Sequence, residues 1–254
     1  MRYVRFLESG AGISHGILGD DHIQVLEGDL FGEHRILERR VPLSSVRLLA
    51  PCLPGKIVGA AANYHSFIRS TNRPHPKHPL IFVKPASSVI GPDEAIVCPN
   101  GEDNVMFEGE LGVVIGKRCR TATAQNALEY VFGCTCVNDI TDHTMLAADG
   151  IWGRGKGSDT FCPLGPVIDT QTNPLDVVIE TRIDGVLKQS ESSSGMVFDV
   201  PTLIAFISRD MTLEPGDVIA TGSPAGVERL LPGQTVTVSI DGIGELRNPV
   251  TVRA

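Results

Sequence analysis

The sequence contains no long hydrophobic run, no Cys-x-x-Cys pair and no excess of positive charge. Its apolar stretches are far too short to span a bilayer, so we expect no membrane as a partner. The N-terminal residues lack the continuous apolar segment and small-residue cleavage site of a secretory signal peptide. The six cysteines show no Cys-x-x-Cys spacing, so we expect reduced thiols and a cytoplasmic location.

The charge balance is acidic. Lysine and arginine number 22 against 30 aspartates and glutamates, which gives a net charge of −8. Phosphate binding needs a basic surface stripe, so this balance argues against nucleic acid as a partner. It suits an enzyme in which a locally bound cation, and not the overall field, attracts an anionic small molecule.

Short strand patterns dominate the 254 residues. Residues 1–52 predict a small β-rich N-terminal domain, and residues 53–254 predict a larger catalytic domain. Asp184-Gly185 and Asp241-Gly242 each follow an alternating strand pattern, which is a strong hairpin signal. Helical patterns are few, so the expected fold class is α+β and β-rich.

Three helices are predicted. One covers residues 124–131, where the apolar residues follow the helical period and Thr123 can cap the N-terminus. Another begins near Pro201, with Asp199 as its cap. The third, over residues 64–73, is polar and weakly patterned, which makes it a candidate lid over a site.

Three acidic residues on two short apolar strands are the most informative feature. Glu108 and Glu110 point to the same strand face, and Gly109 between them allows close approach. Asp139 lies in a second apolar run, residues 134–140. Buried carboxylates are costly unless they are neutralised, and hard divalent cations prefer oxygen ligands. The trio therefore predicts a Mg²⁺ or Mn²⁺ site, with Ca²⁺ as a substitute in crystals; the alternative is three solvated or salt-bridged acids.

Two glycine-rich segments offer further polar groups. Lys156 lies among glycines and could reach a metal-held ligand to stabilise enolate or carboxylate charge, or it is a surface lysine on a flexible loop. Thr221, Gly222 and Ser223 belong to a turn whose hydroxyl and N–H groups could hold a carboxylate. By itself this turn is more simply explained as a structural one.

Two histidines, His65 and His143, are candidate general bases. A lone histidine is more often structural or solvated than catalytic. The sequence pattern alone therefore leaves both roles open.

Taken in order along the chain, these segments resemble the fumarylacetoacetate hydrolase superfamily. The matching blocks are Asn63-Tyr64, Phe82-Val83-Lys84-Pro85, Glu108 to Leu111, Asn138 to Thr141, Lys156 to Thr160, Met211 to Asp217 and Thr221 to Val227. The resemblance implies a mixed β-roll main domain, a small N-terminal domain and a homodimer. It also implies a divalent metal on the acidic trio, a substrate-contacting lysine at Lys156, and substrate-binding positions at Tyr64 and over residues 221–223.

The departures from the family pattern concern the lid and the carboxylate grip. Hydrolytic members carry a histidine and a glutamate that together activate water, and the matching positions here are Phe67 and Ser70. His65 is displaced by two residues, about 200° around a helix, so it is not a simple replacement. The arginine that usually grips a substrate carboxylate is His143, and a nearby glutamine is Leu146.

Three functions are compatible with this pattern. The first is a metal-dependent hydrolase or lyase that cleaves a C–C bond of a 2-oxo or 1,3-dicarbonyl compound through an enolate. Decarboxylation or keto–enol tautomerisation of a 2-oxo diacid such as oxaloacetate suits the missing water-activating pair better. The second is a repurposed biosynthetic enzyme acting on a larger substrate, since Phe67 and Leu146 would make the pocket apolar. The third is a non-catalytic relative that only binds metal or an oxo acid.

Overall fold

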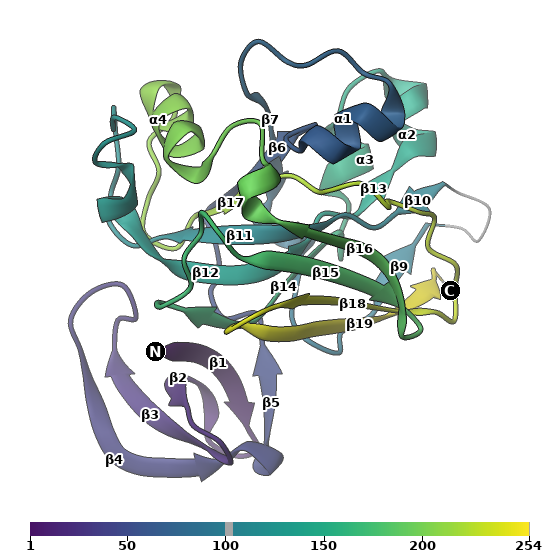
Figure 1. Cartoon of the computed structure of the whole chain (residues 1–254). Helices are drawn as coiled ribbons and strands as arrows, with labels where there is room; N and C mark the ends of the chain where they lie inside the picture. The colour runs from purple at the N-terminus through teal and green to yellow at the C-terminus, as the bar shows by residue number, and fades with distance from the viewer. Residues whose placement is uncertain (100–103, 254) are drawn as a thin grey trace.

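The computed structural model describes residues 1–99 and 104–253. Three sheets and four short α-helices make up this part of the chain, as expected for a β-rich α+β fold (Figure 1). The helices are α1 (His65–Thr71), α2 (His143–Asp149), α3 (Gly153–Gly157) and α4 (Val200–Asp210). None of the helices in the described residues is long and apolar enough to cross a membrane.

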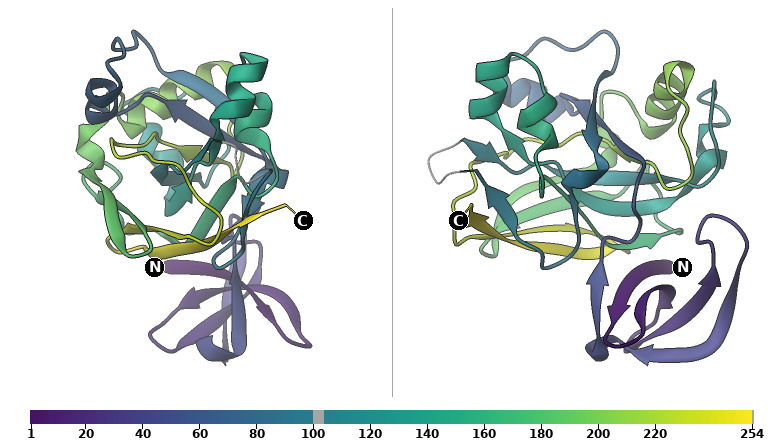
Figure 2. Two further views of the ribbon diagram at one scale, coloured as in Figure 1. Left: turned by 90° about the vertical axis from the view of Figure 1, so that its right-hand side faces the viewer. Right: turned by 180° about the vertical axis from the view of Figure 1, so that it is seen from behind.

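The N-terminal strands form a separate lobe below the main body in both rotated views (Figure 2). They are β1 (Arg2–Glu8), β2 (Gly12–Leu18), β3 (His22–Gly28), β4 (His34–Pro42) and β5 (Val46–Leu49). The lobe is not isolated, because β1 pairs with a strand of the main body at two positions, Arg2 with Asp169 and Tyr3 with Ile168.

The main sheet continues from this junction in the strand order β1-β14-β12-β11-β17-β6-β7. Its strands beyond β1 are β14 (Cys162–Asp169), β12 (Val131–Asn138), β11 (Gly109–Ile115), β17 (Val218–Ala220), β6 (Lys56–Ala61) and β7 (Leu80–Pro85), with β8 (Val89–Ile90) paired to β14. Every residue of β11 is buried, because both faces of this strand are covered.

A second, five-stranded sheet has the order β16-β15-β18-β19-β9. Its strands are β9 (Ile96–Cys98), β15 (Val178–Ile183), β16 (Val186–Ser192), β18 (Thr235–Ile240) and β19 (Gly244–Val252). Both predicted hairpins are present in it: β15 joins β16 through Asp184-Gly185, and β18 joins β19 after Ile240. Asp184 and Gly185 have φ values of 49° and 81°, as a tight hairpin turn requires.

The two sheets pack face to face over one core. Val113 and Ile115 of β11 share a cluster with Val238 and Ile240 of β18. The opposite face of β11 carries Val114, which packs with Val137, Ile168 and the N-terminal lobe. The carboxylate of Glu110 is on this second face, since side chains alternate along a strand. The third sheet is the short pair β10 (Val105–Met106) and β13 (Thr141–Asp142).

The helix predictions had mixed outcomes. Helix α4 begins as predicted, with the Asp199 side chain accepting the N–H of Thr202 and proline in the first turn. Helix α1 occupies the predicted lid segment. The helix predicted over 124–131 was wrong: a 3₁₀ turn covers only Ala127–Tyr130, and Val131 already begins β12. The Asn126 side chain accepts the Thr123 N–H and forms a local turn that competes with helix formation.

Helices α2 and α3 were not predicted. No helix was predicted for the glycine-rich segment around Lys156, and a surface lysine on a flexible loop was one of two alternatives; residues 153–157 form α3 and Lys156 is buried, which excludes that alternative. All six cysteines are buried and form no disulfide among the described residues.

Candidate metal centre and active site

The strand register brings the acidic trio together. In the antiparallel β11–β12 pair, Gly109 faces Asn138, so Glu108 and Asp139 stand opposite each other just beyond the ladder. The Asp139 N–H donates to the Glu108 carbonyl at 2.8 Å. Glu108, Glu110 and Asp139 each offer a carboxylate oxygen, and these oxygens lie within 4.8 Å of one another. Three carboxylates this close are a suitable donor set for one hard divalent cation.

Two buried lysines contact the trio. Lys156 of α3 donates to both Glu108 oxygens at 3.0 Å and to Asp139 Oδ2 at 2.5 Å. Lys84 of β7 donates to Asp139 Oδ1 at 2.5 Å and to the Ile140 carbonyl at 3.1 Å. Lys156 also lies over the Phe82 ring, 4.7 Å from its centroid. When all five groups are charged, the cluster keeps one negative charge.

That uncompensated charge is concentrated at Glu110. Glu110 is 1% exposed and makes no ion pair among the described residues. Burial raises the pKa of Glu110 well above its ordinary value, and the charges of Asp139 and Glu108 raise it further. A divalent cation would supply the missing positive charge, so the residues present fit such an ion.

The pKa values of Asp139 and Lys156 are instead shifted so that their charged forms are favoured. Burial opposes ionisation of Asp139, but the ammonium groups of Lys156 and Lys84 outweigh it and lower its pKa. Burial favours the neutral amine of Lys156, but Asp139 and Glu108 outweigh it and raise the pKa of the lysine. Asp139 is therefore an anion and Lys156 a cation at neutral pH.

Two glycines allow this geometry. A Cβ on Gly109 would stand 1.9 Å from Thr181 Oγ1, so only glycine lets β11 approach β15 between the two glutamates. Gly222 has φ +97°, and a Cβ there would lie 2.7 Å from the Cβ of Asn63. The Gly222 N–H donates to Glu110 Oε2 at 2.8 Å and so orients that carboxylate.

The turn at residues 221–223 serves the scaffold through its polar groups. Thr221 Oγ1 donates to the Leu111 carbonyl at 2.9 Å, while Gly222 holds Glu110. The buried Gln189 donates to Ser223 Oγ at 2.7 Å and accepts the Gly109 N–H at 3.1 Å. The structure therefore places these three predicted substrate-binding residues behind the carboxylates.

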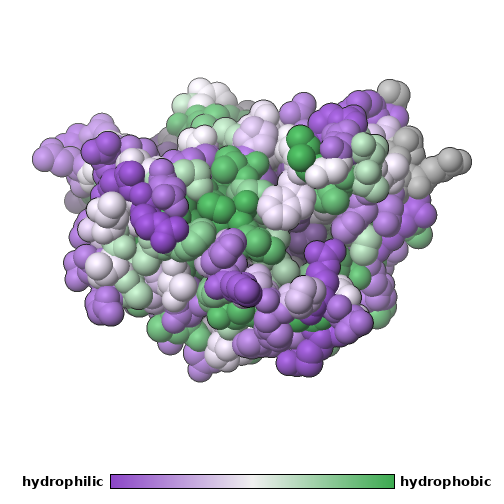
Figure 3. Space-filling view, turned by 90° about the horizontal axis from the view of Figure 1, so that it is seen from above, coloured by the Kyte–Doolittle hydropathy of each residue, from purple (hydrophilic) through white to green (hydrophobic). Residues whose placement is uncertain are grey.

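A cavity of about 250 Å³ opens beside Glu108 and Lys156. It is lined by Ala61, Ala62, Phe67, Thr71, Arg73, Met106, Glu108, Thr141, His143, Leu146, Trp152, Lys156 and Val227. Seen from above, the face over which the helices lie has an apolar centre between hydrophilic margins (Figure 3). The wall is mostly apolar, and its charged side chains are Glu108, Lys156 and, after the lid helix, Arg73.

The cavity separates the predicted site residues into two groups. Phe67 and His143 line it, and burial lowers the pKa of His143, so its imidazole is neutral near pH 7. His65 is exposed on the other side of α1, with its ring 5.2 Å from that of His75. Tyr64 is fully buried outside the lining, and its hydroxyl has no hydrogen-bond partner among the described residues. Ser70 is exposed and donates to the Phe67 carbonyl.

Helix α1 is fixed at its N-terminal end. Asn63 donates to the carbonyls of Thr221 and Phe198 and accepts the Phe198 N–H. Ser66 donates to Glu191 and accepts the Ala225 N–H at 3.1 Å. The lid is therefore tied to the same turn that orients Glu110.

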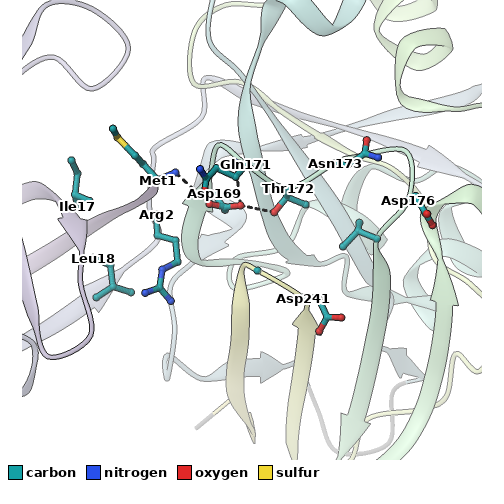
Figure 4. Close-up of a pocket in the computed structure, with 12 residues that line it drawn as sticks. Met1, Arg2, Ile17, Leu18, Asp169, Gln171, Thr172, Asn173, Asp176 and Asp241 are labelled. Atoms are coloured by element: carbon teal, nitrogen blue, oxygen red, sulfur yellow. Dashed lines mark hydrogen bonds and ion pairs between the residues drawn. The ribbon is translucent and has the colours of Figure 1, made fainter.

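A cavity of about 630 Å³, larger than the one beside Glu108, lies elsewhere, between the N-terminal lobe and the main sheet (Figure 4). There the N-terminal ammonium lies 3.7 Å from Asp169, which also accepts the Thr172 hydroxyl. None of the predicted site residues lines it, so its size does not mark the active site.

Residues 12–16 match the Gly-x-Ser-x-Gly spacing, but Ser14 lies within β2 and not at a strand-to-helix turn, so this is no nucleophile elbow.

Three functional candidates were missed from the sequence. Lys84 carried a signal, since a lysine that directly follows the apolar segment 80–83 in a strand pattern needs a buried partner. Gln189 carried none, because its partners come from segments distant in the chain. Arg73 carried none, because it stands in a polar segment among other exposed residues.

Comparison with known proteins matches residues 56–251 to the family described as fumarylacetoacetate (FAA) hydrolase C-terminal, and residues 1–51 to the family described as Rv2993c-like, N-terminal. An uncharacterised protein of Archaeoglobus fulgidus is 45% identical over 208 residues, which cover 82% of this chain and 83% of that protein.

Two solved structures bear on the chemistry. The 2-hydroxyhepta-2,4-diene-1,7-dioate isomerase of Mycobacterium marinum has a TM-score of 0.92 at 38% identity and covers 100% of this chain and 99% of its own. The maleylpyruvate hydrolase of Sphingobium sp. SYK-6, in complex with manganese(II) and pyruvate, has a TM-score of 0.84 at 29% identity, with both chains covered completely.

Proposed function

Since the chain belongs to the fumarylacetoacetate hydrolase superfamily, we propose that it is a Mg²⁺- or Mn²⁺-dependent enzyme that forms the enol or enolate of a 2-oxo acid. The reaction is tautomerisation or decarboxylation, without an activated water. The observation that carries this proposal is the cavity wall, where Glu108 of the acidic trio and a neutral histidine meet but no water-activating pair stands on the lid.

The ion would be held by Glu108, Glu110 and Asp139. When bound, it supplies a Lewis acid that polarises the oxygens of a 2-oxo or 1,3-dicarbonyl compound. The manganese and pyruvate named for the Sphingobium hydrolase support this ligand class.

The protein side chains account for the remaining steps. Lys156, a buried cation beside Glu108, stabilises negative charge that develops on the substrate oxygens. His143 lines the same cavity as a neutral imidazole, so it can take a proton from the substrate carbon or return one to it. Phe67 and Leu146 exclude water from the reacting carbon.

Hydrolysis is the second candidate, favoured by the hydrolase named among the solved structures. It requires a base that activates water on the lid. Phe67 has no titratable group, and Ser70 is exposed with its hydroxyl bonded to the Phe67 carbonyl. The isomerase named at 38% identity supports the proton-transfer reaction instead.

The test is an assay of chelator-stripped protein after addition of Mg²⁺ or Mn²⁺. Oxaloacetate is followed for keto–enol conversion and CO₂ release, and an acylpyruvate is followed for C–C hydrolysis. We expect metal-dependent turnover of oxaloacetate and little acylpyruvate hydrolysis. Turnover of oxaloacetate that is unchanged in His143→Gln would contradict the role of the imidazole, and preferential acylpyruvate hydrolysis would favour the second candidate.

A further inference from the structure

The C-terminal end of the lid helix places a guanidinium at the cavity. Asn72, which follows α1, is left-handed with φ 51°. Its N–H donates to the Arg69 carbonyl, and the Arg73 N–H donates to the Ile68 carbonyl at 3.1 Å. This pair of bonds is a Schellman motif, which reverses the chain direction at a helix end. Arg73 is thereby turned back over its own helix, with its Cζ 5.9 Å from the Phe67 ring centroid.

Arg73 has no anionic partner in the described residues. It forms no ion pair there, and its side chain donates no hydrogen bond to another residue. The other lysine or arginine in the cavity wall, Lys156, is already bound to Glu108 and Asp139. Arg73 is therefore the cation of the cavity that remains available to a ligand.

The surroundings of Arg73 favour an anion of defined shape. Arg73 itself is exposed, but Phe67 and Leu146 make the neighbouring wall apolar. A carboxylate held against that wall would be partly shielded from water, which strengthens its bond to a guanidinium. The planar guanidinium donates two parallel bonds to a carboxylate, which a histidine at position 143 cannot do.

We propose that Arg73 binds a carboxylate of the substrate remote from the acidic trio, so that the substrates are small 2-oxo acids with a second carboxylate. This inference rests on the proposed function, because the 2-oxo acid end is taken to lie at the trio. A cavity of about 250 Å³ suits a short diacid, since ligand pockets usually measure about 300–1,000 Å³. Arg73 also connects substrate charge to the lid, because its backbone N–H is bonded to the Ile68 carbonyl of α1.

The test compares two acids that differ only in the remote group, 2-oxoglutarate and 2-oxovalerate, by titration calorimetry with Mn²⁺-loaded protein. We expect 2-oxoglutarate to bind the wild-type protein more tightly. Arg73→Gln should weaken the binding of 2-oxoglutarate by about tenfold to about a hundredfold and change the Kd for 2-oxovalerate by less than about twofold. Arg73→Lys keeps the positive charge but cannot donate two parallel hydrogen bonds, so its affinity for 2-oxoglutarate should lie between those of the wild type and Arg73→Gln.

Arg69→Gln is the matched control, since Arg69 is exposed on the same helix and lies outside the cavity. It should bind both acids as the wild type does. Equal weakening of both acids in Arg73→Gln, or no weakening, would overturn the assignment of Arg73 while leaving the proposed function in place. Failure of the wild-type protein to bind either acid with Mn²⁺ present would overturn the proposed function, and this inference with it.

Discussion

Substitutions of Asp139 and Glu110, two ligands of the same predicted metal, should have opposite effects on the stability of the metal-free protein. Asp139 is fully buried and accepts from Lys84 and Lys156 at 2.5 Å each. Asp139→Asn therefore leaves two buried ammonium groups facing a neutral amide. Among the described residues, the hydrogen-bond partner of Glu110 is the Gly222 N–H, which a glutamine oxygen also accepts. Glu110→Gln therefore removes a buried charge that nothing compensates.

The magnitudes follow from burial. Breaking a buried ion pair from one side costs about 3–5 kcal/mol. In a domain of this size about 1 kcal/mol shifts Tm by about 2–4 °C, so Asp139→Asn should lower the metal-free Tm by about 6–20 °C. The raised pKa of Glu110 shows that its ionised form is disfavoured, so Glu110→Gln should leave the metal-free Tm unchanged or raise it.

The assay is thermal unfolding of the wild type and both variants, first with EDTA and then with excess Mn²⁺. A ligand at about one hundred times its Kd stabilises by about 2.7 kcal/mol, which corresponds to about 5–11 °C for the wild type. Both variants should lose most of this increase, because each lacks one carboxylate.

The reasoning would be refuted if Glu110→Gln destabilised the metal-free protein as much as Asp139→Asn. That result would mean that Glu110 is compensated within the fold and has no need of a cation. A full Mn²⁺-induced increase in both variants would show that the ion binds elsewhere.

Further predictions concern pH, the turn and the lid. The folded-state pKa of Glu110 lies above the ordinary value of 4.5. The protonated carboxyl therefore stabilises the metal-free fold fully below about pH 4.5, and this stabilisation is lost as the pH rises through the folded-state pKa. Mn²⁺ must displace that proton; its affinity should fall by up to about tenfold per pH unit on acidification, with proton release seen by calorimetry in two buffers. Gly222→Ala, at φ +97°, should cost about 1–3 kcal/mol in chemical unfolding and weaken Mn²⁺ binding, whereas Gly153→Ala, with open space around it, should leave Mn²⁺ binding unchanged. Phe67→His combined with Ser70→Glu should introduce measurable acylpyruvate hydrolysis, and no gain in a folded double variant would count against our explanation of the lid.

Much of the fold could be read from local patterns. The Asp184-Gly185 hairpin and the cap of α4 depend on neighbours in sequence, and both were predicted correctly. The helix predicted over 124–131 failed because the Asn126 side chain closes a local turn and Val131 enters β12, a competition that helical periodicity does not detect.

The sequence by itself determined the acidic trio. The alternation of an extended segment puts Glu108 and Glu110 on one face, and apolar neighbours bury Glu110 and partly bury Glu108. Only the tertiary structure decided their electrostatics, because Lys84 and Lys156 reach Asp139 from β7 and α3. The turn at residues 221–223 shows the same limit, since its free groups in the sequence are committed to distant partners in the fold. Hydrogen bonds and ion pairs between remote segments depend on how sheets and helices pack, and no local pattern encodes that packing.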